Sequence, residues 1–306
     1  MDRLRIGLIG WGTMGAALGE LVLNGPLPLT LARIAVRDPA RARSTELPKG
    51  IEVGTPEDLL VTDVVVELAG GVDGPREWAR ATLDRGAPYV TANKALLATH
   101  GGELAQLADR RVAALLGSAS VGGGTPMIEV TNHLASTGRI ERIRGAINAT
   151  TTYIFEAMGD GRTYDDALHE AQDAGYAEPD ATLDVTGRDA AQKIAILASV
   201  AWSKWRPESE VDTTGIVETE VAPGETVRLV AEATKDAMTV APMRIDPSDR
   251  LARTAGVENL LEITMRDGSV FRVSGPGAGG TASITAVYAD LACLVAGERP
   301  ILFSRG

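Results

Sequence analysis

Apolar residues in the first part of the chain come in short continuous runs, and stretches with helical spacing follow some of them. The runs lie at residues 4–9, 29–36, 61–68 and 88–93, and helical spacing follows at 16–23 and 76–86. A strand buried on both faces gives a continuous apolar run, and strands that alternate with helices build a parallel sheet. The pattern therefore predicts an α/β fold with a doubly wound parallel sheet and a ligand at the carboxyl ends of its strands.

A different pattern occupies the later part of the chain. Strand-like runs lie at residues 226–234, 238–245 and 260–274, and the last contains Asp267-Gly268, a hairpin turn sequence. With residues 140–148 they predict a mixed or antiparallel sheet in a second domain. The last apolar stretch, 282–297, has helical length, and we expect it to pack on the first domain. We therefore predict a discontinuous first domain, residues 1–122 with 281–306, and a second α+β domain at residues 123–280.

Composition narrows the class of protein. The 306 residues are ample for two domains, and the net charge of −11 makes general binding of nucleic acid unfavourable. No apolar run is long enough to span a bilayer, and no leader pattern precedes the first strand. The single cysteine, Cys293, cannot form an internal disulfide, which fits a reducing cytoplasm. Three scattered histidines argue against a zinc site or a Ser-His-Asp triad.

The clearest motif follows the first predicted strand. Residues 10–15 read Gly-Trp-Gly-Thr-Met-Gly, a G-x-G-x-x-G sequence between a strand and a helix. The glycines permit a tight turn and close approach of the backbone to a pyrophosphate, which the helix N-terminus attracts. We therefore predict a Rossmann-type dinucleotide-binding domain, with a cofactor contacted by Gly10, Gly12, Thr13, Met14 and Gly15.

The end of the second predicted strand bears on which dinucleotide binds. Arg37 stands there, with Arg41 and Arg43 close behind it. An arginine at this place accommodates the extra phosphate of NADP, whereas an acid takes the ribose hydroxyls of NAD. Arg37 therefore favours NADP. The neighbouring Asp38 keeps NAD open, and Asp38 followed by Pro39 also suits a helix cap.

Three more cofactor positions lie beside predicted strands or the last helix. Ala69 begins an Ala-Gly-Gly sequence after the strand at 61–68, and Lys94 follows the strand at 88–93. A lysine at this edge can reach the nicotinamide or the substrate, or it can simply point to water at a helix start. Gly279 belongs to a glycine-rich run before the last helix, which would return the chain to the cofactor.

Residues 175–193 concentrate charged side chains, among them Glu178, Asp184, Asp189 and Lys193. Asp189 and Lys193 are four residues apart, so they share one face of a helix. Carboxylates can hold a substrate ammonium group, and a lysine that shares its charge with them can pass a proton. The same residues also fit a solvated acidic loop followed by one exposed ion pair.

These motifs together resemble the homoserine dehydrogenase family. The matching segments cover nearly the whole chain in the family's order: GLIGWGTMG, ANK, SVGGGTP, GAINATTTYI, GYAEPDATLDVTGRDAAQK, GPGAGG and TASITAVYADL. The family interconverts L-homoserine and L-aspartate 4-semialdehyde with NAD or NADP. The resemblance implies a Rossmann domain, a small amino-acid substrate, and a homodimer formed largely through a second domain with a mixed sheet.

The resemblance also assigns roles to residues. It implies that Lys193 is the catalytic acid–base, that Lys94 is its partner near the nicotinamide and the substrate, and that Asp189 belongs to the same catalytic group as a carboxylate that holds the substrate. Substrate-binding positions implied by the motifs are Glu178, Asp184, Thr150 and Tyr176. A turn whose carbonyls hold a sodium ion in the family matches Val121, Gly123 and Thr125.

The sequence departs from the family at several of these places. Ser118 stands where a glutamate of the sodium site is common, so whether a metal binds there stays open. Ala149 and Thr152 replace the glycine and the second asparagine of N-G-T-x-N-Y. Ala181 replaces a usual proline, and Ala69 a common threonine near the nicotinamide. The carboxy-terminal ACT domain of longer members is not in the sequence, so we expect no feedback control through one.

Two rival functions follow. The altered positions suit a related NAD(P)-dependent dehydrogenase that acts on another small amino acid or semialdehyde. A nucleotide-sensing protein without catalysis would keep only the Rossmann core. The retention of Lys94, Glu178, Asp189 and Lys193 argues against a sensor, because binding a nucleotide does not need all four.

Overall fold

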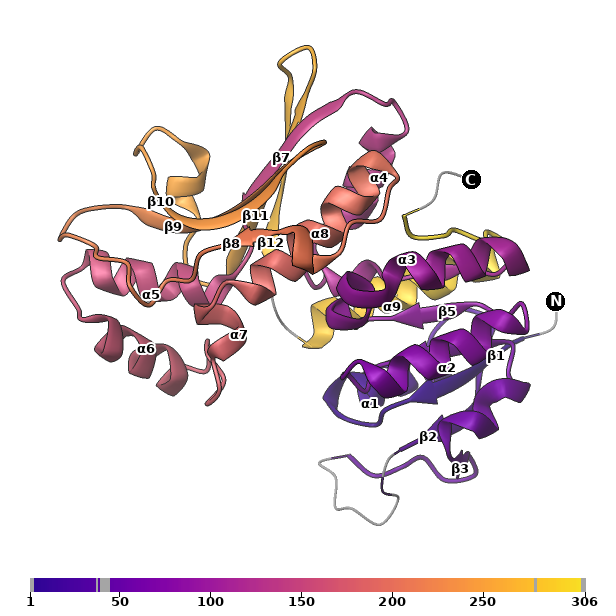
Figure 1. Cartoon of the computed structure of the whole chain (residues 1–306). Coiled ribbons are helices and arrows are strands. Elements are labelled where there is room, and N and C mark those ends of the chain that lie inside the picture. The colour runs from indigo at the N-terminus through magenta and orange to yellow at the C-terminus, as the bar shows by residue number, and fades with distance from the viewer. Residues whose placement is uncertain (1–2, 37, 39–44, 278–279, 304–306) are drawn as a thin grey trace. The chain divides into compact units, whose positions relative to one another are not determined.

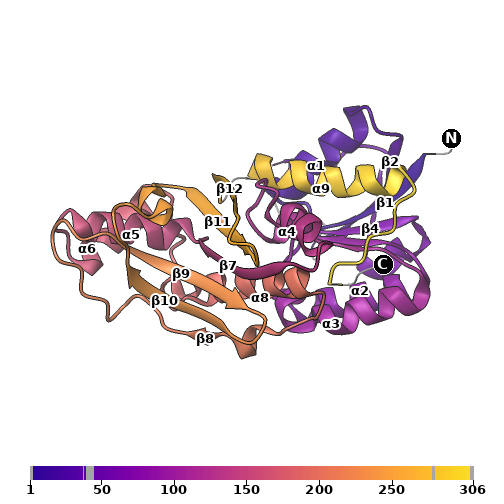
Figure 2. The same ribbon diagram turned by 90° about the horizontal axis from the view of Figure 1, so that it is seen from above.

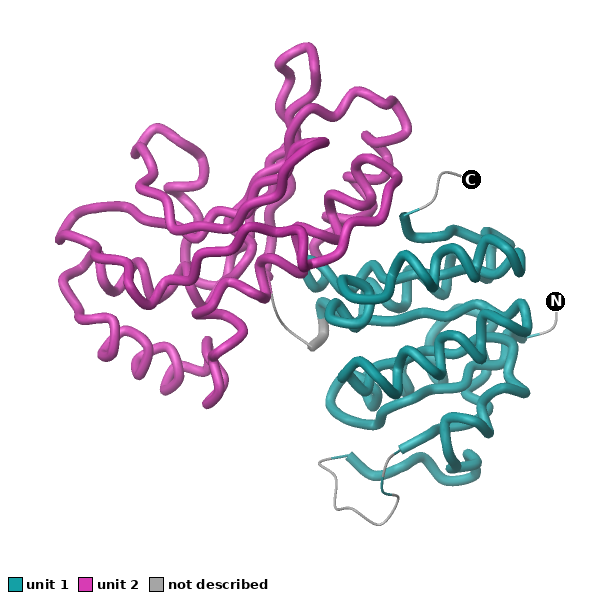
Figure 3. Tube along the Cα trace, viewed as in Figure 1, with its two compact units in different colours: residues 1–124, 279–306 teal, residues 125–278 magenta. Residues whose placement is uncertain are grey.

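The computed structural model describes residues 3–36, 38, 45–277 and 280–303 of the chain (Figure 1). The chain divides into two compact units, which we call unit 1, Met1–Gly124 with Gly279–Gly306, and unit 2, Thr125–Ala278 (Figure 3). The boundaries expected from the sequence differ from this division by two residues at each crossing. That the units act as separate cofactor and substrate domains stays a prediction.

Unit 1 contains a six-stranded parallel sheet in the order β3-β2-β1-β4-β5-β6. Its strands are β1 (Leu4–Ile9), β2 (Leu29–Ala35), β3 (Glu52–Gly54), β4 (Val64–Glu67), β5 (Tyr89–Thr91) and β6 (Leu115–Leu116). This is the strand order of the Rossmann fold, and β1 pairs with both β2 and β4 at the point where the order reverses. The predicted fold class is confirmed, and the carboxyl ends of β1 and β4 flank the place where dinucleotides bind in such sheets.

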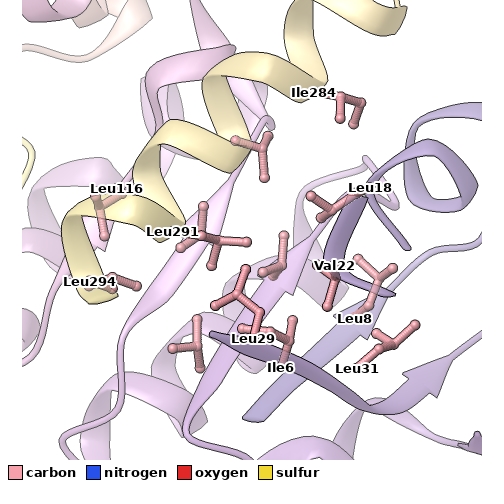
Figure 4. Packing of buried hydrophobic residues seen from close by; sticks show 14 of the residues in the cluster. Ile6, Leu8, Leu18, Val22, Leu29, Leu31, Leu116, Ile284, Leu291 and Leu294 are labelled. Atoms are coloured by element: carbon pink, nitrogen blue, oxygen red, sulfur yellow. The ribbon is translucent and has the colours of Figure 1, made fainter. Parts of the chain in front are cut away.

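Helices of unit 1 cover its sheet. They are α1 (Thr13–Asn24), α2 (Asp73–Asp84), α3 (Lys94–Arg111) and α9 (Gly280–Val295), with the 3₁₀ helices η1 (Pro56–Val61) and η2 (Ser118–Ser120). The last helix, α9, places Ile284 and Leu291 in the same buried cluster as Leu18 of α1 and Ile6 and Leu8 of β1 (Figure 4). Residues from the two ends of the chain therefore complete one core.

Unit 2 contains a mixed sheet in the order β12-β11-β7-β9-β10-β8. Its strands are β7 (Ile140–Ala146), β8 (Asp212–Thr213), β9 (Val227–Thr234), β10 (Met238–Arg244), β11 (Glu258–Met265) and β12 (Val270–Pro276). All neighbours are antiparallel except β8 and β10. The predicted hairpin joins β11 to β12, and Gly268 of its turn has a φ of +83°, which glycine adopts without strain. The expectation of a second, mixed sheet is confirmed.

One buried helix organises the other half of unit 2. The helices are α4 (Met127–Ala135), α5 (Ala149–Gly159), α6 (Tyr164–Asp173), α7 (Thr182–Val185) and α8 (Arg188–Trp202), with η3 (Glu208–Glu210) and η4 (Arg250–Arg253). α5 and α8 pack against strands of the sheet, and α8 also contacts α4 and α7 (Figures 1 and 2). Every residue of α8 from Asp189 to Ala201 is buried, so its polar side chains must find partners inside unit 2.

No described helix is suited to span a membrane. Among those within residues 3–36, 38, 45–277 and 280–303, none combines the length and apolar character that crossing a bilayer requires.

Candidate active site

The turn between β1 and α1 has the geometry of a phosphate-binding loop. Gly10 has a φ of +99°, and a Cβ on Gly15 would collide with the carbonyl oxygen of Gly10. Only glycine at position 15 therefore lets the first turn of α1 pack on the loop. Among the described residues, nothing lies within 4 Å of the place where a Cβ on Gly12 would stand. This loop leaves room for a ligand against its backbone.

The N-terminus of α1 has the charge distribution of an anion-binding site. Gly12 caps the helix without a side-chain hydrogen bond, and the first turn has no acidic residue. The amide groups of a first helical turn have no partners within the helix, and the helix dipole favours negative charge there. Thr13 is exposed and Met14 is half-buried in that turn. The residues present therefore fit the pyrophosphate of a dinucleotide.

A buried carboxylate organises the next loop of unit 1. Glu67, fully buried at the end of β4, accepts hydrogen bonds from the amides of Ala69 (2.7 Å) and Gly70 (2.8 Å) and from Thr91 Oγ1 (2.7 Å). Three neutral donors thus hold the turn that contains Ala69. Glu67 was not predicted from the sequence, although an acid that ends an apolar run of valines is a detectable signal.

The start of α3 is connected to the same loop. Asn93 caps α3 by accepting a hydrogen bond from the Leu96 amide (3.1 Å), and its Nδ2 donates to the Gly71 carbonyl (2.7 Å). The Asn93 amide donates to Thr91 Oγ1 (3.0 Å). The loops after β4 and β5 are therefore linked. Lys94 follows directly, half-buried at the first position of α3 and at the carboxyl end of β5.

Two predicted cofactor positions, Arg37 and Gly279, lie outside the described residues, whereas Asp38 is described and exposed. The three predicted sodium positions are divided between the units, with Val121 and Gly123 in unit 1 and Thr125 in unit 2. The sodium site stays a prediction.

At position 118, where the family commonly has a glutamate of the sodium site, Ser118 binds a carboxylate instead of supplying one. Its amide and Oγ donate to the Asp290 carboxylate of α9, at 3.1 and 2.6 Å. Within the part of the chain that the structure describes, no cluster of three or more His, Cys, Asp and Glu side chains suits a metal ion.

In unit 2, the predicted pair on α8 forms and is buried. Lys193 Nζ lies 2.7 Å from Asp189 Oδ2, and both side chains are about nine-tenths enclosed. Lys193 Nζ also donates to the carbonyl of Ile147 (2.8 Å), which follows β7. A buried lysine and carboxylate of this kind depend on each other, because removing one leaves the other charge without compensation. The alternative of an exposed surface pair does not apply.

Asn148 connects this pair to Asp184. Its Nδ2 donates to Asp189 Oδ2 (2.8 Å) and to Asp184 Oδ1 (2.6 Å), and its Oδ1 accepts from the Thr151 amide at the start of α5 (2.8 Å). Asp184 is half-buried on α7. Asn148 is 3% exposed and was not singled out from the sequence. The structure thus gathers Asp184, Asp189 and Lys193 around one asparagine.

The remaining predicted substrate positions lie along the loop between α6 and α7 or face it. Thr150 Oγ1 donates to the carbonyl of Tyr176 (2.8 Å), and the ring of Tyr176 lies 4.9 Å from that of Tyr153, centroid to centroid. Tyr176 is partly exposed and Glu178, two residues on, is exposed. The Glu178 carboxylate therefore faces solvent at the edge of this loop.

The same loop holds one more carboxylate, Asp180. The hydroxyl and the amide of Thr182 lower the pKa of Asp180 by hydrogen bonding to its charged form. This acid therefore remains ionised and accepts a hydrogen bond from the amide of Thr182, the first residue of α7.

Comparison with known proteins covers both units. The family model "Homoserine dehydrogenase" matches residues 126–292, and "Homoserine dehydrogenase, NAD binding domain" matches residues 10–116. Homoserine dehydrogenase of Bacillus subtilis is 30% identical over 98% of this chain and 74% of its own length. That of Corynebacterium glutamicum is 33% identical over 94% of this chain and 70% of its own.

Solved structures agree with these sequence matches. A hyperthermophilic archaeal homoserine dehydrogenase in complex with NADPH superposes with a TM-score of 0.87 at 27% identity, over 98% of this chain and 99% of its own. The enzyme of Thiobacillus denitrificans gives a TM-score of 0.86 at 28% identity, over 96% and 74%. The chain therefore belongs to the homoserine dehydrogenase family, whose members are NAD(P)-dependent oxidoreductases that act on a CH–OH group.

Proposed function

We propose that this protein interconverts L-homoserine and L-aspartate 4-semialdehyde, with NADP as the preferred cofactor. The observation that carries the proposal is the buried Lys193–Asp189 pair, held beside Asp184 in the part of the chain that matches the homoserine dehydrogenase family. NADP is supported by Arg37 in the sequence and by the archaeal relative, whose structure contains NADPH.

The cofactor-binding residues are those of the β1–α1 loop. Gly10, Gly12 and Gly15 allow the backbone to approach the pyrophosphate, and the first-turn amides of α1 receive its charge. Thr13 and Met14 lie in that first turn, and Glu67 fixes the neighbouring turn at Ala69. When bound, the nicotinamide supplies the hydride-transfer chemistry.

Lys193 is the proton donor and acceptor in this proposal. Within the described residues, its Nζ has two acceptors, Asp189 and the Ile147 carbonyl, so one of its three N–H groups remains for the reacting oxygen. In the direction of reduction, Lys193 gives a proton to the developing alkoxide. In the direction of oxidation, the neutral amine accepts the hydroxyl proton of homoserine.

The substrate amino group calls for the carboxylates. Glu178 is exposed and Asp184 half-buried, so both are able to meet an ammonium group that enters from solvent. A site that pairs with this ammonium group rejects aldehydes that lack it, because its carboxylates would lose their partner. Thr150 and Tyr176 line the same loop.

Two of the departures from the family motif, Thr152 and Ala181, are buried, whereas Ala149 is partly buried and Ala69 is exposed. Thr152 is 2% exposed, and its hydroxyl donates to the Asn148 carbonyl (3.1 Å) within α5. Ala181 is also buried. These two substitutions therefore change packing within unit 2, and that of Thr152 lies beside Asn148.

The test is homoserine oxidation by the purified protein with NADP⁺ and with NAD⁺, followed by nicotinamide absorbance. We expect turnover with both and a higher kcat/KM with NADP⁺. Activity confined to another amino alcohol in a substrate panel would replace homoserine, and NADPH binding without turnover of any panel member would favour a sensor.

We further propose a homodimer formed through unit 2, a cytoplasmic location, and a sodium ion at the carbonyls of Val121, Gly123 and Thr125. Ser118 supplies a hydroxyl where the family commonly has a carboxylate, and that hydroxyl donates to the carboxylate of Asp290. Light scattering after gel filtration tests the dimer. Activity measured as sodium replaces potassium at constant ionic strength tests the ion.

A further inference from the structure

Asn148 stands at the junction of β7 and α5, where it contacts more of the site than a helix cap requires. We infer that its side chain is a positioning residue that holds the carboxylate of Asp184 and the proton-transfer pair, Asp189 and Lys193, in one arrangement. This inference rests on the proposed function and extends it to a residue outside the predicted site.

Both N–H donors of the Asn148 amide are used, and its oxygen accepts one hydrogen bond. A primary amide has two N–H donors and one carbonyl oxygen. The donors go to Asp184 Oδ1 and Asp189 Oδ2, and the oxygen accepts from the Thr151 amide. At 3% exposure, water competes little for these bonds. The side chain therefore has one favourable orientation, because exchanging its nitrogen and oxygen would place the oxygen against both carboxylates and the N–H groups against the Thr151 amide.

Two consecutive residues hold both members of the ion pair. The Ile147 carbonyl accepts from Lys193 Nζ (2.8 Å), and the Asn148 side chain donates to Asp189 Oδ2 (2.8 Å), the same oxygen that lies 2.7 Å from Nζ. A shift of Asn148 would therefore move the carboxylate and the amine relative to each other.

The chemistry explains why an amide suits this place. The oxygens of Asp184 and Asp189 are close neighbours because both lie within hydrogen-bond distance of one nitrogen. Two carboxylates so close repel each other, and one tends to take up a proton. A cationic side chain between them would compete with Lys193 and with the substrate ammonium group. The neutral amide stabilises both charges and leaves them available to those two cations.

Of the described charged groups around α8, Asp189 on the same helix pairs with Lys193, and Asp184 on α7 is linked to that pair through Asn148. Charged groups on the other elements that pack against α8 have partners of their own or are exposed: Arg144 on β7, Glu208 on η3, Arg228 and Glu232 on β9, Arg244 on β10, and Glu129 and His133 on α4.

The substitution Asn148→Asp separates positioning from capping. Aspartate is as good an N-cap as asparagine, so the acceptor for the Thr151 amide is kept. The two N–H donors are lost, and a negative oxygen takes the place of the nitrogen between two carboxylates. If Asn148 only caps α5, kcat, KM and the pH profile stay those of the unaltered protein.

We expect a different result from kinetics across pH. For Asn148→Asp, kcat for homoserine oxidation falls at least about thirtyfold near neutrality, because the Asp189–Lys193 pair is displaced and the proton stays on Lys193. The rise of kcat with pH moves to higher pH by about one unit or more. Asn148→Ser, which keeps a cap without adding charge, moves it less. NADPH affinity, measured by fluorescence titration, stays unchanged in both.

The control is Thr163→Ala at the N-cap of α6, where the Thr163 side chain accepts from the Asp166 amide (3.2 Å). It lowers the melting temperature as the loss of a cap does, with kcat and pH profile unchanged. Unaltered kinetics in Asn148→Asp, or equal kinetic losses in Thr163→Ala, would overturn the inference.

A titration without substrate makes the inference independent of the assay. In protein labelled with ¹³C-lysine, the Cε signal of Lys193, assigned by its absence in Lys193→Arg, titrates at higher pH in Asn148→Asp than in the unaltered protein. Equal midpoints would defeat the positioning role even if homoserine is oxidised. A higher midpoint would support it even if homoserine proves to be the wrong substrate.

Discussion

Glu67 in unit 1 and Asp189 in unit 2 are both buried carboxylates, yet the groups that stabilise them differ in kind. Glu67 accepts from two backbone amides and a threonine hydroxyl, whereas Asp189 meets the ammonium group of Lys193 and an amide. Neutral donors of the first kind fix the geometry of a loop. An ammonium group also fixes geometry, but it carries a proton that can leave. The partner of a buried acid, and not its burial, therefore indicates proton transfer.

The largest effect is expected when the amine that carries the proton is removed. Lys193→Ala should lower kcat for homoserine oxidation at least about a hundredfold and leave NADPH affinity near normal, because the β1–α1 loop is unaltered. Steady-state kinetics and fluorescence titration measure the two quantities. Near-normal turnover would remove Lys193 from the mechanism.

A matched control accompanies this variant. Loss of the amine leaves Asp189 buried without its cation, which costs about 3–5 kcal/mol of stability, so kinetics must be measured well below the melting temperature. Lys204→Ala removes an exposed lysine just beyond the end of α8 and should change neither kcat nor melting.

An effect of intermediate size is expected at Glu67, on cofactor binding and not on turnover. Glu67→Gln keeps one oxygen for the amides of Ala69 and Gly70 but turns a second acceptor into a donor. We expect the KM for NADPH to rise about tenfold, the loss of roughly one good hydrogen bond, with kcat at saturating cofactor nearly unchanged. The pH profile of kcat should not move. A displaced profile would mean that Glu67 takes part in proton transfer and would end the contrast with Asp189.

The smallest effect is expected at a third carboxylate, Asp249, whose partner is an arginine. Asp249 accepts from the Leu251 amide (3.0 Å) and pairs with Arg144 (2.8 Å), whose guanidinium does not release its proton. Burial acts to raise the pKa of Asp249, but the Leu251 amide and Arg144 together hold it below its usual value. A depressed folded-state pKa contributes stability above the unfolded value, and this contribution is lost as pH falls through the folded value.

Asp249→Asn, which keeps the acceptor for the Leu251 amide, should therefore cost about 1 kcal/mol of unfolding free energy at pH 7 and leave kcat intact. The difference from the unaltered protein should shrink as pH falls below about 4. Urea unfolding at several pH values measures it. A difference that stays constant with pH would show that the charge is not its source.

Much of the fold follows from local patterns. Continuous apolar runs and the glycine motif predicted the parallel sheet, and Asp267-Gly268 predicted the hairpin between β11 and β12. The short strands β3 and β8 were not predicted, because two or three residues carry no measurable periodicity and pair only after neighbouring strands are in place.

The candidate site was predictable only where its residues are close in sequence. The spacing of Asp189 and Lys193 predicted that they share one helix face, but it left open an exposed ion pair, and their burial became evident only in the structure. Asn148 and Glu67 were missed because Asn148 reaches partners 36 and 41 residues away and Glu67 reaches Thr91 24 residues away. Such contacts depend on tertiary structure, which a single sequence does not display.

The packing of α9 against α1 and β1 has a consequence for synthesis on the ribosome. The core of unit 1 needs Ile284 and Leu291, whereas unit 2 is continuous from residue 125 to 278. Translation therefore delivers all of unit 2 before the last piece of unit 1, so the half of the protein that is made first is completed last.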